Sequence, residues 1–246
     1  MSFGSVKLVH NDGTMHHLGI DDAVVAKKVI LTPDPLEIPF YAALLDDAKK
    51  VGEYREYVTY TGTYKGTPIS VMSCGFGCMP MAIAVEELNH LGVKDMIKIA
   101  PCPALQPETK AGSFFAASGA IRGDGASREY IDISYPAVTD MELLSSLLKT
   151  GVKSVGLFRS HDCLSLETPW AIGGKERLKY WENLGIEVID GETSSMFVVG
   201  SILQCRTASL ALISENYTTG EKLADLEEGK KEMFRLAVEA LCNAAD

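Results

Sequence analysis

Short apolar runs alternate with amphipathic stretches along the whole chain. Runs rich in β-branched and aromatic residues predict strands, and apolar residues spaced three or four positions apart predict helices. The predicted strands cover residues 25–32, 56–74 (a hairpin that turns at Lys65-Gly66), 95–100, 112–121, 153–160, 186–190 and 207–215. The predicted helices cover residues 35–51, 80–92, 141–151, 174–185, 194–205 and 221–246.

Strands and helices alternate through short connections marked by glycine, which is typical of α/β proteins. The pattern therefore predicts a three-layer α/β/α sandwich. No repeat, linker or low-complexity tract divides the 246 residues, so we expect a single domain over 1–246.

Charge and hydropathy narrow the range of partners. The chain has 33 acidic and 23 basic residues, a formal net charge of −10. Nucleic acids and anionic membranes attract basic surfaces, so we expect neither as a partner. No apolar run approaches the roughly 20 residues that span a bilayer. The first residues lack a signal-peptide pattern, and we therefore expect a cytoplasmic protein.

The six cysteines lie in or beside apolar stretches and form no CxxC pair. This spacing indicates neither a disulfide framework nor a zinc site. We expect free cysteines that behave as small apolar residues, with no metal and no organic cofactor.

Ligands of α/β sheets bind beyond the carboxyl ends of the strands. The corresponding segments are 32–37, 73–80, 100–103, 160–163, 190–192 and 214–216. Gly75 and Gly77 are more typical of a turn than of a phosphate loop, because the full GxGxxG spacing is missing. Glu192 and Glu215 each follow a β-run, where a buried carboxylate needs a partner or a ligand. These residues alone are equally compatible with a binding role and with a solvated loop.

Three long segments carry a family resemblance. Residues 61–107 begin with the hairpin sequence TGTYKG, residues 121–144 contain DGAS, and residues 189–216 run from IDGE to ISEN. In sequence and in order, these segments are similar to the hexameric purine nucleoside phosphorylase and uridine phosphorylase family. The resemblance implies a mixed, partly barrel-like central sheet. It also implies a pentosyltransferase that cleaves the N-glycosidic bond of a small-molecule nucleoside.

The same resemblance suggests a role for individual residues. Glu192 matches the Glu that binds the ribose hydroxyls, with Gly191 in place of the usual Met. Glu215 matches the acid that donates a proton towards the base, and it keeps the same carboxyl chemistry. In the base pocket, Leu164 takes the place of a Phe that stacks on the base.

The family completes each site with residues of a neighbouring subunit. His17 matches the His that contacts the ribose 5′-hydroxyl, and Arg55 matches an Arg that reaches phosphate. The resemblance therefore implies a homodimer-based oligomer of up to six subunits.

The phosphate side departs from the family pattern. Pro33 replaces a Gly and has no N–H to donate, and Glu37 reverses the charge of an Arg. Lys98 replaces a second Arg and loses its bidentate geometry. Residues 100–103 read APCP in place of a turn with a hydroxyl donor. Each missing donor to a charged group costs about 2–4 kcal/mol, so inorganic phosphate is expected to bind weakly.

Three hypotheses follow from these substitutions. The first is phosphorolysis, with phosphate as co-substrate and an anion site rebuilt from Lys98, Arg55 and Arg159. The second is hydrolysis of the nucleoside, with Glu37 activating water. The third is a nucleoside- or sugar-binding protein that keeps Glu192 but has lost catalysis.

Overall fold

The computed structural model describes residues 9–244. Its strands are β1 (Lys28–Thr32), β2 (Asp46–Tyr54), β3 (Tyr57–Tyr64), β4 (Thr67–Ser73), β5 (Asp95–Ala104), β6 (Phe114–Gly123), β7 (Ala137–Val138), β8 (Ser154–His161), β9 (Ile186–Asp190) and β10 (Arg206–Asn216). Its helices are α1 (Ile38–Ala42), α2 (Cys78–His90), α3 (Ala126–Tyr130), α4 (Met141–Lys149), α5 (Gly174–Asn183), α6 (Thr193–Ile202) and α7 (Leu226–Asn243), with 3₁₀ turns at Pro35–Glu37 and Leu164–Leu166.

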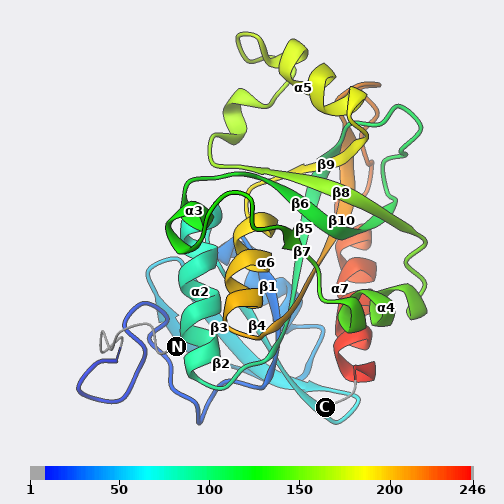
Figure 1. Ribbon diagram of the computed structural model, residues 1–246. Helices are drawn as coiled ribbons and strands as arrows, with labels where there is room; N and C mark the ends of the chain where they lie inside the picture. The colour runs from blue at the N-terminus through cyan, green and yellow to red at the C-terminus, as the bar shows by residue number, and fades with distance from the viewer. Residues whose placement is uncertain (1–8, 245–246) are drawn as a thin grey trace.

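The strands form one mixed sheet in the order β10-β6-β8-β9-β5-β1-β4-β3-β2, and β7 pairs with β6 (Figure 1). β10 also pairs in parallel with β5, from Arg206 opposite Asp95 to Asn216 opposite Ala104. This second pairing closes β5, β10, β6, β8 and β9 into a barrel. The predicted α/β class with a partly barrel-like sheet is confirmed.

The remaining strands extend the sheet outward from β5. β1 lies parallel to both β5 and β4, and β4, β3 and β2 continue as antiparallel neighbours. Lys65 and Gly66 connect β3 to β4 with φ angles of +50° and +82°. Two successive residues with positive φ match the twist of a hairpin, so the predicted turn is confirmed.

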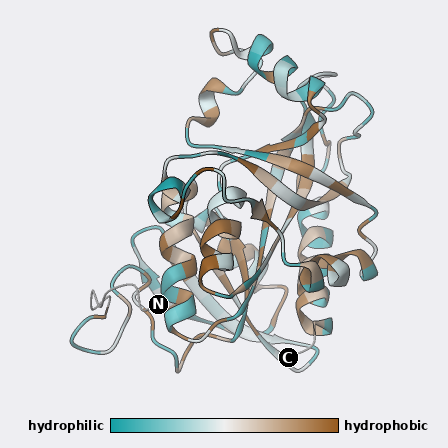
Figure 2. Ribbon diagram, viewed as in Figure 1, coloured by the Kyte–Doolittle hydropathy of each residue, from teal (hydrophilic) through white to brown (hydrophobic). Residues whose placement is uncertain are grey.

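Helices cover both faces of the sheet (Figure 1). α2, α3 and α6 pack against one another on one face, and α4 packs against α7 on the other. The alternation along β1 shows the two faces directly, because Val29 and Leu31 belong to the cluster under α2 whereas Ile30 belongs to the cluster under α7. Figure 2 shows apolar residues gathered in the central strands and α6, while α5 is largely hydrophilic.

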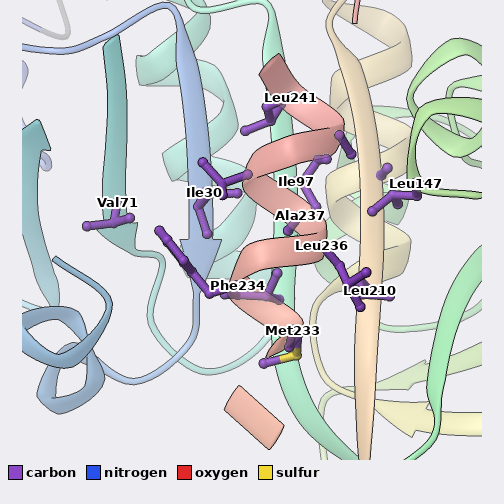
Figure 3. Close-up of a cluster of buried hydrophobic side chains, with 14 of the residues drawn as sticks. Ile30, Val71, Ile97, Leu147, Leu210, Met233, Phe234, Leu236, Ala237 and Leu241 are labelled. Atoms are coloured by element: carbon purple, nitrogen blue, oxygen red, sulfur yellow. The ribbon is translucent and has the colours of Figure 1, made fainter. Parts of the chain in front are cut away.

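The C-terminal helix contributes a large part of the core. Asp225 caps α7 by accepting a hydrogen bond from the Glu228 N–H at 3.1 Å. Phe234 of α7 is 1% exposed and packs in the same cluster as Ile97 and Leu210 (Figure 3). Burial of one such side chain stabilises the fold by about 1.5–3 kcal/mol. Among residues 9–244, no helix is long and apolar enough to cross a membrane.

Several predicted boundaries are wrong, and two of them concern the sheet. The predicted helix over 35–51 ends at Ala42, and the chain enters β2 at Asp46. Most of β2 is exposed and polar, and its pairing with β3 determines its conformation despite weak local propensity. The predicted strand over 95–100 continues to Ala104, because Pro101 and Pro103 still pair with β10.

Candidate active site

A cavity of about 230 Å³ opens at the carboxyl ends of β1, β5, β8 and β9. The loop after β1, the turn before α2, the second half of β5, residues 164–168, the junction between β9 and α6, and Tyr217 form its wall. Strand ends of an α/β sheet are the usual place for a ligand, so this position agrees with the expectation from the sequence.

Glu192 lies in this wall and is held at both oxygens. It precedes α6, and only 3% of its surface is exposed. Gly77 donates its backbone N–H to Oε1 at 2.9 Å, and Nζ of Lys98 lies 2.9 Å from Oε2. Gly77 has a φ of +98°, a conformation that favours glycine. Each carboxylate oxygen has a second lone pair, so Glu192 can still accept hydroxyl hydrogen bonds from a ligand.

Lys98 lies beneath the cavity between two carboxyl groups. Its side chain is 1% exposed, and Nζ lies 2.5 Å from Oδ2 of Asp190 as well as next to Glu192. Burial alone would lower the pKa of Lys98, but the attraction of Asp190 and Glu192 outweighs burial and raises the pKa well above its usual value. The ammonium group is therefore retained. This geometry disfavours its use as a phosphate ligand, because both carboxyl groups already hold it.

Asp190 completes this buried network, and the sequence analysis did not single it out. Ser160 donates its hydroxyl to Oδ1 at 2.6 Å, while the hydroxyl and backbone N–H of Thr193 donate to Oδ2. A signal was present in the sequence, because a lysine inside a buried strand such as 95–100 requires an anionic partner.

Leu164 and Gly191 meet on the apolar side of the cavity. Both lie in its wall. A Cβ atom added to Gly191 would lie 3.2 Å from Cδ1 of Leu164 and 3.8 Å from Cα of Gly77. Leu164 thus occupies space next to the position where a methionine is usual in the family. The structure brings these two residues together with Glu192, and their base-binding role stays a prediction.

The two proposed catalytic carboxylates lie outside the cavity wall. Glu37 pairs with Lys230 of α7 at 2.5 Å. Glu215 lies 3.5 Å from Lys222, and its side chain is 26% exposed. Neither residue contributes to the cavity lining in the described chain. Their catalytic roles stay predictions, and the Glu37 carboxylate is already engaged by the Lys230 ammonium outside the cavity wall.

His17 and Arg55 also lie away from the cavity of their own chain. Nδ1 of His17 lies 2.6 Å from Oε1 of Glu87, whose carboxylate also accepts the backbone N–H groups of His17 and Leu18. Arg55 lies in the turn between β2 and β3, with its guanidinium 5.4 Å from the ring centre of Tyr54. Their assignment to the site of a neighbouring subunit stays a prediction.

Cations near the cavity are already paired. Nε and Nη2 of Arg159 donate to Oε1 of Glu167 at 3.2 and 3.1 Å, and the guanidinium lies 4.2 Å from the ring centre of Trp181. No Lys, Arg or His contributes to the lining formed by the described residues. Within residues 9–244, no group of three or more His, Cys, Asp or Glu side chains could hold a metal ion.

Comparison with known proteins agrees with this architecture. The profile of the phosphorylase superfamily matches residues 27–246. The chain is 33% identical over 248 aligned positions to a uridine phosphorylase of Treponema pallidum, covering 96% of each chain. It is 29% identical to a guanosine phosphorylase of Halorubrum lacusprofundi, covering 93% of this chain and 96% of the relative.

A solved structure shows the same fold. The uridine phosphorylase of Vibrio fischeri superposes with a TM-score of 0.84 at 29% sequence identity, covering 95% of this chain and 99% of the other. Sequence profile, relatives and fold agree over nearly the whole length, and the chain therefore belongs to the phosphorylase superfamily.

Proposed function

We propose that this protein is a pentosyltransferase that cleaves the N-glycosidic bond of a small-molecule nucleoside and transfers the pentosyl group to phosphate. Membership of the superfamily supports this proposal, as do relatives named as uridine and guanosine phosphorylases. The cavity at the strand ends supplies a concave place for the nucleoside.

Glu192 is the observation that carries the proposal. Its carboxylate lies in the cavity wall, is almost fully buried, and is fixed by the Gly77 N–H and the Lys98 ammonium. A fixed two-oxygen acceptor suits the neighbouring 2′- and 3′-hydroxyls of a ribose. Because its position does not depend on the ligand, little reorganisation is needed when the sugar binds.

The local charge favours the chemistry at the sugar. Cleavage of an N-glycosidic bond passes through a sugar with positive character. Glu192 and Asp190 present two carboxyl groups, and Lys98 balances only one of them. Excess negative charge close to the sugar stabilises a developing oxocarbenium ion, and this stabilisation is greatest in the transition state.

The phosphate that accepts the pentosyl group needs cations that the cavity lining of the described chain does not supply. Lys98 and Arg159 are paired within the described chain, and the cavity lining contains no cation. We therefore propose that Arg55 of a neighbouring copy completes the phosphate site, in a homodimer-based oligomer of up to six subunits. The proposal includes a single domain over 1–246, a cytoplasmic location and no cofactor other than phosphate as co-substrate.

No observation favours the hydrolytic alternative, because Glu37 is bound to Lys230 outside the cavity wall. The third hypothesis, sugar binding without catalysis, makes a different prediction for the same experiment. Under that hypothesis, nucleosides bind but release no base whether or not phosphate is present.

The test is base release from a panel of purine and pyrimidine nucleosides, with and without phosphate. We expect phosphate-dependent release from at least one nucleoside, and a drop of about 10²-fold or more in kcat/KM for Glu192→Gln. The control is Glu176→Gln, which removes an exposed carboxylate from α5 outside this cavity. Absence of phosphate-dependent release from the whole panel would refute the proposal.

A further inference from the structure

Glu167 has one carboxylate oxygen that is satisfied and one that is not. The residue is 3% exposed. Oε1 accepts hydrogen bonds from Nε and Nη2 of Arg159 and from Nε1 of Trp181, at 3.2, 3.1 and 3.2 Å. Oε2 is shielded from solvent and has no hydrogen-bond partner among residues 9–244. A buried carboxylate oxygen without a donor is unfavourable, so such an atom calls for a ligand.

The unsatisfied group belongs to the wall of the candidate active site. Glu167 lines the cavity that contains Glu192, and it also lines an adjacent hollow of about 570 Å³ formed with Arg159 and Trp181. Arg159 and Trp181, the two residues that donate to Oε1, therefore approach it from the second hollow. Arg159 is itself fixed, because its guanidinium lies over the ring of Trp181.

The other carboxylate oxygens of the cavity wall already have donors. Both oxygens of Asp190 accept from Ser160, Lys98 or Thr193. Both oxygens of Glu192 are held by Gly77 or Lys98. Within the described chain, Oε2 of Glu167 is thus the carboxylate oxygen of this lining that still lacks a donor.

The position of Glu167 assigns it to the base and not to the sugar. It follows Leu164, the residue predicted to contact the base, by three residues in the same wall, whereas Glu192 lies at the junction of β9 and α6 and is held by Gly77 and Lys98. Leu164 and Leu166 are 36% and 41% exposed. Because both side chains lie partly in solvent, the turn that they form can shift when a base enters and approaches Oε2.

We propose that Glu167 determines base specificity by accepting an N–H hydrogen bond, and that the preferred substrate is a nucleoside of a 2-amino-6-oxopurine. This inference rests on the proposed function and specifies its substrate class. Such a base presents a ring N–H next to an amino group, two donors on one edge. Uracil presents its ring N–H between two carbonyl oxygens, and both carbonyls would be repelled by a carboxylate.

Glu167→Gln gives a sharp test because it replaces the hydrogen-bond acceptor at the position of Oε2 by a hydrogen-bond donor. Arg159 and Trp181 offer only donors, so they will hold the amide oxygen of the glutamine in the place of Oε1. The amide NH₂ group then replaces Oε2 and offers donors where the wild type offers an acceptor. The exposed Glu176→Gln change is the matched control, because it removes the same charge from the second hollow without touching the cavity.

Dissociation constants of guanosine, inosine and uridine are measured by calorimetry for the three proteins. Inosine differs from guanosine only by the missing 2-amino group. We expect the wild type and Glu176→Gln to bind guanosine about 10-fold or more tightly than inosine or uridine. In Glu167→Gln, guanosine binding should weaken by about 10- to 100-fold, and the order of guanosine and uridine should reverse.

The ratio of the constants within one protein does not depend on the fraction that is folded. Equal binding of guanosine and uridine by the wild type, or an unchanged ratio in Glu167→Gln, would overturn the inference even if phosphate-dependent base release is observed. Conversely, a guanosine preference that depends on Glu167 without any base release would uphold the inference and refute the proposed function. Absence of all nucleoside binding would overturn both.

Discussion

Replacement of Lys98 by methionine tests the buried network most directly. The change removes an ammonium that lies 2.5 Å from Asp190 and 2.9 Å from Glu192 and leaves an apolar chain of similar length. Two carboxyl groups, 4% and 3% exposed, then face each other without a cation. Removal of one partner from a buried ion pair typically destabilises a protein by about 3–5 kcal/mol, and we expect a loss in this range.

The loss of stability in Lys98→Met should depend on pH in a defined direction. The raised pKa of Lys98 means that the stabilisation by its ammonium is complete below the usual lysine pKa and declines only as the pH rises through the higher folded-state value. In the variant, the two buried carboxyl groups lose their shared cation and repel each other when both are charged. Proton binding relieves this repulsion, so the deficit should be smaller at about pH 5 than at about pH 8.

Urea unfolding of Lys98→Met and of wild type at these two pH values gives the free energies. The control is Lys153→Met on the exposed surface, for which we expect a change within about 0.5 kcal/mol. Activity should fall as well, because Glu192 loses one of the two groups that position it. A deficit of Lys98→Met below about 1 kcal/mol that is independent of pH would refute the reasoning.

Two further predictions concern the cavity and the loop after β1. Gly191→Met should reduce nucleoside affinity about 10-fold or more, because the new side chain meets Leu164 and fills the cavity. Isothermal titration calorimetry measures the affinity, and an unchanged affinity would contradict this prediction. Glu37→Gln should leave the rate of base release without phosphate unchanged. It should lower the free energy of unfolding by about 1 kcal/mol or less, because the ion pair with Lys230 is lost. Loss of phosphate-independent hydrolysis in this variant would instead support Glu37 as a base.

The fold could largely be predicted from local patterns. The sequence Lys65-Gly66 predicts the hairpin turn because few other residue pairs accept two positive φ angles. The strand β2 could not be predicted in this way, because its polar residues are held by backbone pairing with β3 and not by their own propensity. The closure of the barrel depends on contacts between β5 and β10, more than 100 residues apart, which no local window contains.

The site was partly predictable for a related reason. The sequence indicates Glu192 as a site residue because a carboxylate directly after a buried strand needs a partner or a ligand. The structure places Glu192 in the cavity wall. The same rule also selected Glu215, but a neighbouring lysine on the return loop pairs with that residue at the surface. Glu167 carried no such signal, because its burial depends on Arg159 and Trp181 from other elements.

The prolines of β5 have a consequence for how the two sides of the cavity can adapt. Pro101 and Pro103 each fix their own φ angle and lie in register opposite Leu212 and Glu215 of β10, so this wall is stiff from both its covalent structure and its barrel pairing. Adjustment to a ligand must then come from residues 164–168 across the cavity. Substitutions that change substrate selectivity should therefore occur mainly in residues 164–168, whereas substitutions in β5 should mainly impair folding.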